Sequence, residues 1–129
     1  MIDAGFDVTL WARRAEALAA FSDAKHTADV AALGSEADHI GVCVVDDTGV
    51  REICDQLIPV IKAGSRIVIH STVHPDPCVA LAAQGTVRGI HVLDAPVSGG
   101  ELAAKAGALT VMVGGDADFV DELVDTFLA

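Results

Sequence analysis

The run Ile40-Gly41-Val42-Cys43-Val44-Val45 is apolar along its whole length and is closed by Asp46-Asp47. An unbroken apolar run that ends in turn-forming acids is typical of a strand buried on both faces, as in a parallel sheet. A helical pattern follows directly, with Thr48 as the expected N-cap and apolar side chains recurring at helical spacing up to Ile61. A buried strand followed by an amphipathic helix therefore forms the centre of the predicted fold.

The same alternation of strand and helix continues in both directions from this run. After it, strands are predicted at 66–70, 89–94 and 109–113, and helices at 75–83 and from Asp116 onward. Before it, a strand is predicted at 8–11, a helix at 14–21 and a weaker helix at 28–33. Gly34 and Gly85 are expected to end the helices that precede them. Alternation of this kind predicts a doubly wound α/β fold with a parallel sheet.

The composition limits the classes of function. The chain has 129 residues, enough for one domain, and 52% of them are hydrophobic, which is typical of a globular protein. Eight Lys and Arg against nineteen Asp and Glu give a net charge of −11, which disfavours nucleic acid and anionic membranes as partners. No apolar run approaches the roughly 20 residues of a membrane span. Three cysteines without a CxxC motif indicate free thiols, so we expect a cytoplasmic protein.

Ligands of doubly wound sheets bind beyond the carboxyl ends of the strands, so the residues after each strand are the candidates for chemistry. Four segments of the sequence occupy such positions: 12–14, 46–47, 70–74 and 94–100. Two of these segments carry distinctive motifs, Asp94-Ala95-Pro96-Val97-Ser98-Gly99-Gly100 and Ser71-Thr72-Val73 with Pro75. The first is followed by a second glycine-rich segment, Gly107 to Gly115.

With these motifs the chain resembles the β-hydroxyacid dehydrogenases, a family that includes enzymes like 3-hydroxyisobutyrate, tartronate semialdehyde and 6-phosphogluconate dehydrogenase. The resemblance covers essentially the whole chain and implies a Rossmann-type NAD(P)-binding domain. It implies that Ser98, Gly99 and Gly100 bind the substrate carboxylate through a hydroxyl and backbone N–H groups. Glycine suits this role because backbone can approach an anion where no Cβ intervenes. Ser71 and Thr72 would lie against the nicotinamide end of the cofactor.

The rest of the implied cofactor site lies on two other segments. Three residues at the end of the first buried run would line the dinucleotide with backbone and apolar side chains, while also being buried in the strand: Cys43, Val44 and Val45. Where NAD-binding relatives carry an acid for the ribose 2′-hydroxyl, this chain has Ala12, followed by Arg13 and Arg14. Guanidinium groups suit a 2′-phosphate, so we expect a preference for NADP, with NAD as the other possibility.

Two parts of the family pattern are missing from the sequence. No two glycines are spaced as G-x-G, so the first strand and its Gly-rich turn would precede Met1. That strand would lie between the strands at 8–11 and 40–45, and its absence would interrupt the sheet there. The catalytic Lys would lie in a helical domain after Ala129. The chain is therefore expected to be a partial NAD(P)-binding domain, 1–129, that is inactive alone.

The expected function of the whole enzyme is NADP-preferring oxidation of small 3-hydroxy acids by hydride transfer to the nicotinamide. The alternative is a non-catalytic dinucleotide-binding or assembly module that is completed by another chain or by a second copy of itself. His70, His74 and Cys78 recur at intervals of four, but Pro75 and Pro77 prevent one helix through them, so no metal site is predicted. A phosphoacceptor receiver domain is disfavoured because the last predicted strand ends in glycines, without a Lys.

Overall fold

The centre of the fold is a three-stranded parallel sheet. In the computed structural model, which describes residues 2 and 5–128 without the side chains of 122 and 125–128, its strands are β3 (His39–Val42), β4 (Arg66–Ile69) and β5 (His91–Asp94). They lie in the order β3-β4-β5, with β4 in the middle, and the register pairs Ile40 with Ile67 and Ile67 with Val92. The predicted parallel sheet is therefore confirmed for the middle of the chain.

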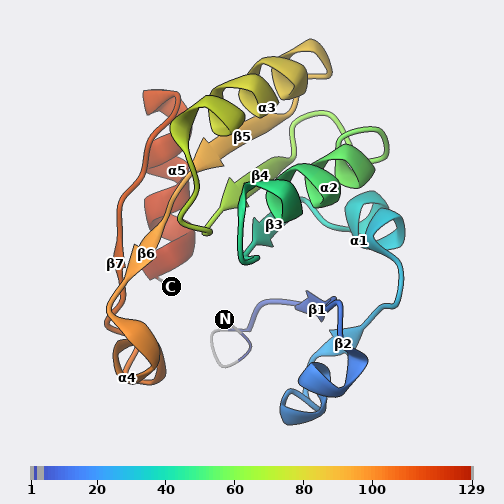
Figure 1. Cartoon of the computed structure of the whole chain (residues 1–129), viewed down its shortest axis with the longest axis vertical. Coiled ribbons are helices and arrows are strands. Elements are labelled where there is room, and N and C mark those ends of the chain that lie inside the picture. The colour runs from blue at the N-terminus through green and yellow to red at the C-terminus, as the bar shows by residue number, and fades with distance from the viewer. Residues whose placement is uncertain (1, 3–4, 129) are drawn as a thin grey trace.

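Helices cover both faces of this sheet (Figure 1). One face packs against α1 (Val30–Glu36), α2 (Asp47–Leu57) and α3 (Pro75–Val87), and α5 (Ala117–Leu128) lies on the other. The first face contains the larger core, in which Val50, Cys54, Leu57, Ile67 and Ile69 are completely buried. The second core is smaller and is formed by Val68, Leu93, Ala95 and Leu123. Burial on both faces accounts for the consecutive apolar residues of β4 and β5. In β3, which was also predicted to be buried on both faces, Ile40 and Val42 are buried but Gly41 is exposed.

The N-terminal strands form a separate unit. β1 (Thr9–Leu10) and β2 (Lys25–His26) pair in parallel, and between them the chain forms a short 3-10 helix, η2 (Ala15–Ala20), where an α-helix was predicted. Among the described residues, no ladder joins this pair to β3, so the sheet is interrupted where the sequence predicts a missing strand. No residue of η2 is buried, which explains why its apolar pattern does not extend into a longer helix.

The segment after β5 leaves the parallel sheet. β6 (Val97–Ser98) pairs antiparallel with β7 (Thr110–Val111), and the two extend away from the sheet as an arm with α4 (Gly100–Lys105) at its tip (Figure 1). The sequence predicted a loop at 96–100, but residues 97–98 of this segment form β6. The strand predicted at 109–113 is present as the shorter β7, but it pairs antiparallel with β6 and does not join the parallel sheet.

The helix boundaries differ from the predictions at several points. α2 ends at Leu57, short of the predicted Ile61. The N-cap of α2 is Asp46, not Thr48, because the Asp46 carboxylate accepts the Gly49 N–H at 2.8 Å. Gly34 and Gly85 lie inside α1 and α3 and do not end them. A Cβ on Gly85 would lie 2.9 Å from the Ile90 carbonyl oxygen, so this glycine allows close packing of the helix on the chain entering β5.

Candidate functional site

The carboxyl ends of β3 and β4 are joined by a side chain of the predicted nicotinamide site. Ser71 is buried, and its Oγ accepts the Val44 N–H at 2.8 Å. Further along the same loop, the His74 N–H donates to the Asp47 carboxylate at 3.1 Å. These two hydrogen bonds link the segments that follow neighbouring strands. Ser71 therefore shapes the edge, while Thr72 beside it is exposed.

The residues predicted to line the dinucleotide are more exposed than the sequence suggested. The strand ends at Val42, so Cys43, Val44 and Val45 lie beyond the sheet. Cys43 is exposed and Val45 has 96% of its surface accessible, which corrects the prediction that they are buried strand residues. Val44 is partly buried against the core. A chain that leaves the sheet at this point presents apolar side chains and backbone to whatever binds along the edge.

The two predicted phosphate-binding arginines differ in their surroundings. Arg13 Nη2 donates to Glu52 Oε2 of α2 at 2.6 Å, and both side chains remain more than half exposed, at 56% and 57%. The same Nη2 would lie 3.3 Å from a Cβ on Gly49, so the guanidinium rests against the first turn of α2. Arg14 is exposed and extended at the start of η2. The acidic partner of Arg13 was not predicted, because Glu52 lies 39 residues away in the sequence.

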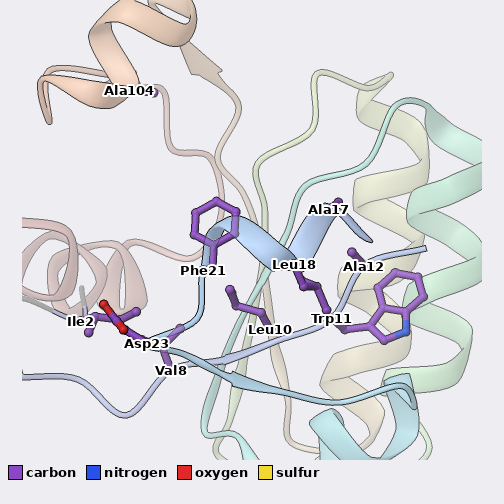
Figure 2. Close-up of a pocket in the computed structure, with 10 residues that line it drawn as sticks. All are labelled: Ile2, Val8, Leu10, Trp11, Ala12, Ala17, Leu18, Phe21, Asp23 and Ala104. Atoms are coloured by element: carbon purple, nitrogen blue, oxygen red, sulfur yellow. The ribbon is translucent and has the colours of Figure 1, made fainter. Parts of the chain in front are cut away.

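Two open pockets lie beside the N-terminal unit formed by β1, η2 and β2. One, of about 440 Å³, lies between the ends of β1 and β2 and is lined by Trp11, Ala12, Arg13, Ala15, Leu18, His26, Thr27 and Ala28. The larger, of about 740 Å³, is lined mainly by apolar residues of β1 and η2, with Ala104 of α4 on its far side (Figure 2). Asp23 is the acidic residue in its lining. Phosphate groups need N–H donors or cations, so the pocket that contains Arg13 suits a nucleotide better.

The predicted substrate residues lie at the base of the arm. Ser98 ends β6 with its side chain exposed, and Gly99 and Gly100 have positive φ angles of 133° and 66°. A Cβ on Gly99 would lie 2.6 Å from that of Ala103, so this glycine is needed for packing as well as for its backbone angle. A Cβ on Gly100 would meet nothing within 4 Å. Gly100 is therefore the position where the backbone is open to a ligand.

Behind the arm, two side chains hold the end of β5. Burial, with a smaller effect of the Asp94 carboxylate, raises the pKa of the Cys78 thiol of α3 to about 11. Burial also raises the pKa of Asp94, against the opposing effect of the Cys78 hydrogen bond. The Asp94 backbone exchanges hydrogen bonds with Gly114 of 3.0 and 2.7 Å. The sequence predicted no partner for Cys78, since the contact joins a helix to a distant strand.

His70 also has a structural contact. Its Nδ1 lies 3.0 Å from the Ala95 carbonyl oxygen, which can only accept, so this nitrogen donates. Among the residues that the structure describes, no group of three or more His, Cys, Asp or Glu side chains could hold a metal ion. Nor is any of the helices in that part of the chain long and apolar enough to cross a membrane.

Comparison with known proteins places this geometry in a family. Residues 1–129 match the family model of the NAD binding domain of 6-phosphogluconate dehydrogenase. The chain is 37% identical over 124 residues to an uncharacterized oxidoreductase of Mycobacterium tuberculosis, covering 93% of this chain and 42% of that protein. It is 36% identical over 121 residues to the NAD-dependent L-serine dehydrogenase of Pseudomonas aeruginosa, covering 93% and 38%.

A solved structure agrees with these sequence matches. The 3-hydroxyisobutyrate dehydrogenase of Salmonella typhimurium superposes with a TM-score of 0.83 at 28% identity, covering 90% of this chain and 42% of that one. The chain thus spans about two-fifths of the length of the proteins it matches. The Rossmann-type fold predicted from the sequence is confirmed.

Proposed function

The chain belongs to the family of the NAD binding domain of 6-phosphogluconate dehydrogenase, and on that premise we propose that it is the cofactor-binding part of a dehydrogenase of small 3-hydroxy acids. Two of the relatives are named for L-serine and 3-hydroxyisobutyrate, which are both short carboxylic acids with a hydroxyl on carbon 3. The shared chemistry is oxidation of that hydroxyl. A bound nicotinamide would supply the hydride acceptor.

The carboxyl edge of the sheet fits a dinucleotide. Cys43, Val45 and Thr72 are exposed there, and the Ser71–Val44 hydrogen bond fixes the backbone that carries them. These residues would pack along the cofactor and exclude water from the nicotinamide. Free cysteines at 43, 54 and 78 are consistent with work in a reducing cytosol.

The adenosine end supports a preference for NADP. Arg13 and Arg14 follow the end of β1, Ala12 supplies no acid for a ribose 2′-hydroxyl, and the pocket of about 440 Å³ includes Arg13. A guanidinium binds a phosphate through paired, charge-assisted hydrogen bonds. This is the observation that carries the NADP assignment.

The substrate carboxylate would bind at the base of the arm. Ser98 offers an exposed hydroxyl, and the open space around Gly100 allows its N–H to reach an anion. Together they would orient the acid so that carbon 3 faces the nicotinamide. The group that takes the hydroxyl proton would be a Lys outside these 129 residues, so we expect no turnover by the chain alone.

A second function remains a specific alternative. The interruption between β1 and β3 supports a binding or assembly module that is completed by another chain or by a second copy, rather than a free-standing enzyme. If this is so, the isolated chain will bind neither cofactor tightly until that partner is added.

The experiment that tests the proposal supplies the missing parts from a relative. Residues 1–129 replace the matching segment of the Pseudomonas L-serine dehydrogenase, and kcat/KM is measured with NADP⁺ and NAD⁺ on a panel of 3-hydroxy acids. We expect oxidation with NADP⁺ preferred, and about a tenfold or greater loss for NADP⁺ alone when Arg13 and Arg14 become Ala. Ser98→Ala should lower kcat/KM for the acid without changing cofactor affinity. Equal losses with both cofactors would contradict the NADP assignment, and a folded chimera without activity would contradict the dehydrogenase assignment.

A further inference from the structure

The acidic side chain of Glu52 contacts Arg13, one of the two arginines proposed to bind the 2′-phosphate of NADP. Glu52 lies in the middle of α2, and its Oε2 is 2.6 Å from Arg13 Nη2. The pair joins the loop after β1 to a helix of the three-stranded sheet. The guanidinium therefore already has a carboxylate partner on the protein surface.

The guanidinium of Arg13 lies against the first turn of α2, close to Gly49. Gly49 is buried beneath it, and a Cβ there would lie 3.3 Å from Arg13 Nη2 and 3.2 Å from a methyl of Val44. The other nearby acid, Asp46, uses its Oδ1 to accept the Gly49 N–H at 2.8 Å. Glu52 is thus the carboxylate that pairs with Arg13, whereas Asp46 caps the helix.

We propose that Glu52 is a specificity-determining residue that weakens the binding of 2′-phosphorylated nucleotides by competing for Arg13. This inference rests on the proposed function, because it needs Arg13 to contact the adenosine ribose. A 2′-phosphate on Arg13 must either displace the Glu52 carboxylate or lie beside it, and two anions at one guanidinium repel each other. A nucleotide with a free 2′-hydroxyl brings no such charge. Glu52 therefore reduces the discrimination between NADP and NAD that the arginines create.

The test uses the 129-residue chain and two half-cofactors, adenosine 2′,5′-bisphosphate and AMP, which probe only the adenosine end. Dissociation constants are measured by ligand-observed NMR, which reads weak binding. Glu52→Gln should tighten the bisphosphate about 2- to 5-fold, the size expected for an exposed ion pair, and change AMP less than twofold. The effect should shrink as salt is raised. Glu101→Gln is the matched control, because Glu101 also forms an exposed 2.6 Å pair, with Lys105 of α4.

A double-mutant cycle with Arg13→Gln shows whether Glu52 acts through Arg13. The gain from Glu52→Gln should disappear when Arg13 is already Gln. The inference would be overturned if Glu52→Gln still tightened bisphosphate binding in the Arg13→Gln background. It would also be overturned if Glu52→Gln left the ratio of the dissociation constants for the bisphosphate and AMP unchanged. Either result would leave the proposed function intact. A wild-type chain that binds neither probe would count against the proposed adenosine site itself and remove the inference with it.

Discussion

The three-stranded sheet and the β1–η2–β2 unit are held together very differently. In the sheet, four-residue strands pair along their full length and completely buried side chains fill both faces. In the N-terminal unit the strands have two residues each, and no residue of its strands or of η2 is buried. Its contacts with the larger part of the molecule include Trp11, which packs against the main core, and the Arg13–Glu52 pair. Stability therefore resides in the sheet, while the residues that would select the cofactor lie on the weakly buried unit.

The largest contrast is expected from matched leucines. Leu57→Ala removes a completely buried side chain of α2 and should lower the free energy of unfolding by about 2–5 kcal/mol. Leu18→Ala in η2 removes a half-buried side chain and should lower it by about 1 kcal/mol or less. Urea denaturation followed by circular dichroism measures both values. Equal losses would show that the two regions unfold as one closely packed body.

Two helical glycines sharpen the contrast within the well-packed part. A Cβ on Gly85 would press on the Ile90 carbonyl at 2.9 Å, whereas one on Gly34 would meet side-chain methyls of Val60 and Leu57 at 3.0 and 3.1 Å. Gly85→Ala should therefore destabilise the protein by about 1–3 kcal/mol, despite the gain in helix propensity. Gly34→Ala should stay within about 1 kcal/mol of wild type, because side chains can move. The same urea titration tests this order, and a reversed order would contradict it.

The cysteines allow a comparison of the edge of the sheet with its core. Cys43 is exposed beyond β3, whereas burial raises the pKa of Cys54 to about 12 and that of Cys78 to about 11. Because the thiolate is the reactive form, iodoacetamide at pH 8 should alkylate Cys43 at least about tenfold faster than the other two. Mass spectrometry of timed samples measures the three rates. In urea the rates should converge, and a fast Cys78 in the native protein would contradict its burial.

The smallest effect concerns pH. Burial, together with the nearby charges of Arg66 and His70, lowers the pKa of His39 at the start of β3. The unfolded chain therefore takes up a proton near pH 6.5 before the folded one does, so stability should fall as pH drops below that value. His39→Gln should flatten the fall between about pH 7 and 5 by less than about 1 kcal/mol. Leu18→Ala, which keeps His39, should retain the wild-type slope of unfolding midpoint against pH.

Much of the sheet could be predicted because each strand has buried apolar residues, on both faces in β4 and β5 and on one face in β3. The run at 40–45 is apolar throughout, and the runs at 66–70 and 89–94 contain the apolar segments Ile67-Val68-Ile69 and Val92-Leu93. The helix after the first run was indicated by its apolar spacing, and the helix after the second by Pro75 and Pro77. β2 was missed because Lys25 and His26 are exposed and give no apolar pattern. Gly85 was taken for a helix end because its role, close approach to the Ile90 carbonyl, depends on a tertiary contact.

The segments of the candidate site could be predicted from the sequence, but the side chains that contact them could not. The rule that ligands bind beyond carboxyl ends selected the segments at 12–14, 46–47, 70–74 and 94–100. The side chains that act on them come from elsewhere: Glu52 on Arg13, and Cys78 on Asp94. Such pairs depend on how helices pack across the sheet, which no local spacing encodes.

The arm also indicates how this protein could change in evolution. Gly99 is fixed by the Ala103 methyl, and a side chain on Gly115 would collide with Leu93, so both ends of the excursion tolerate little variation. Between them, most of α4 and the following turn is exposed. Mutations can therefore accumulate at the tip without disturbing the strands that carry Ser98. The excursion is therefore constrained by packing at its two ends and free to vary in its exposed middle.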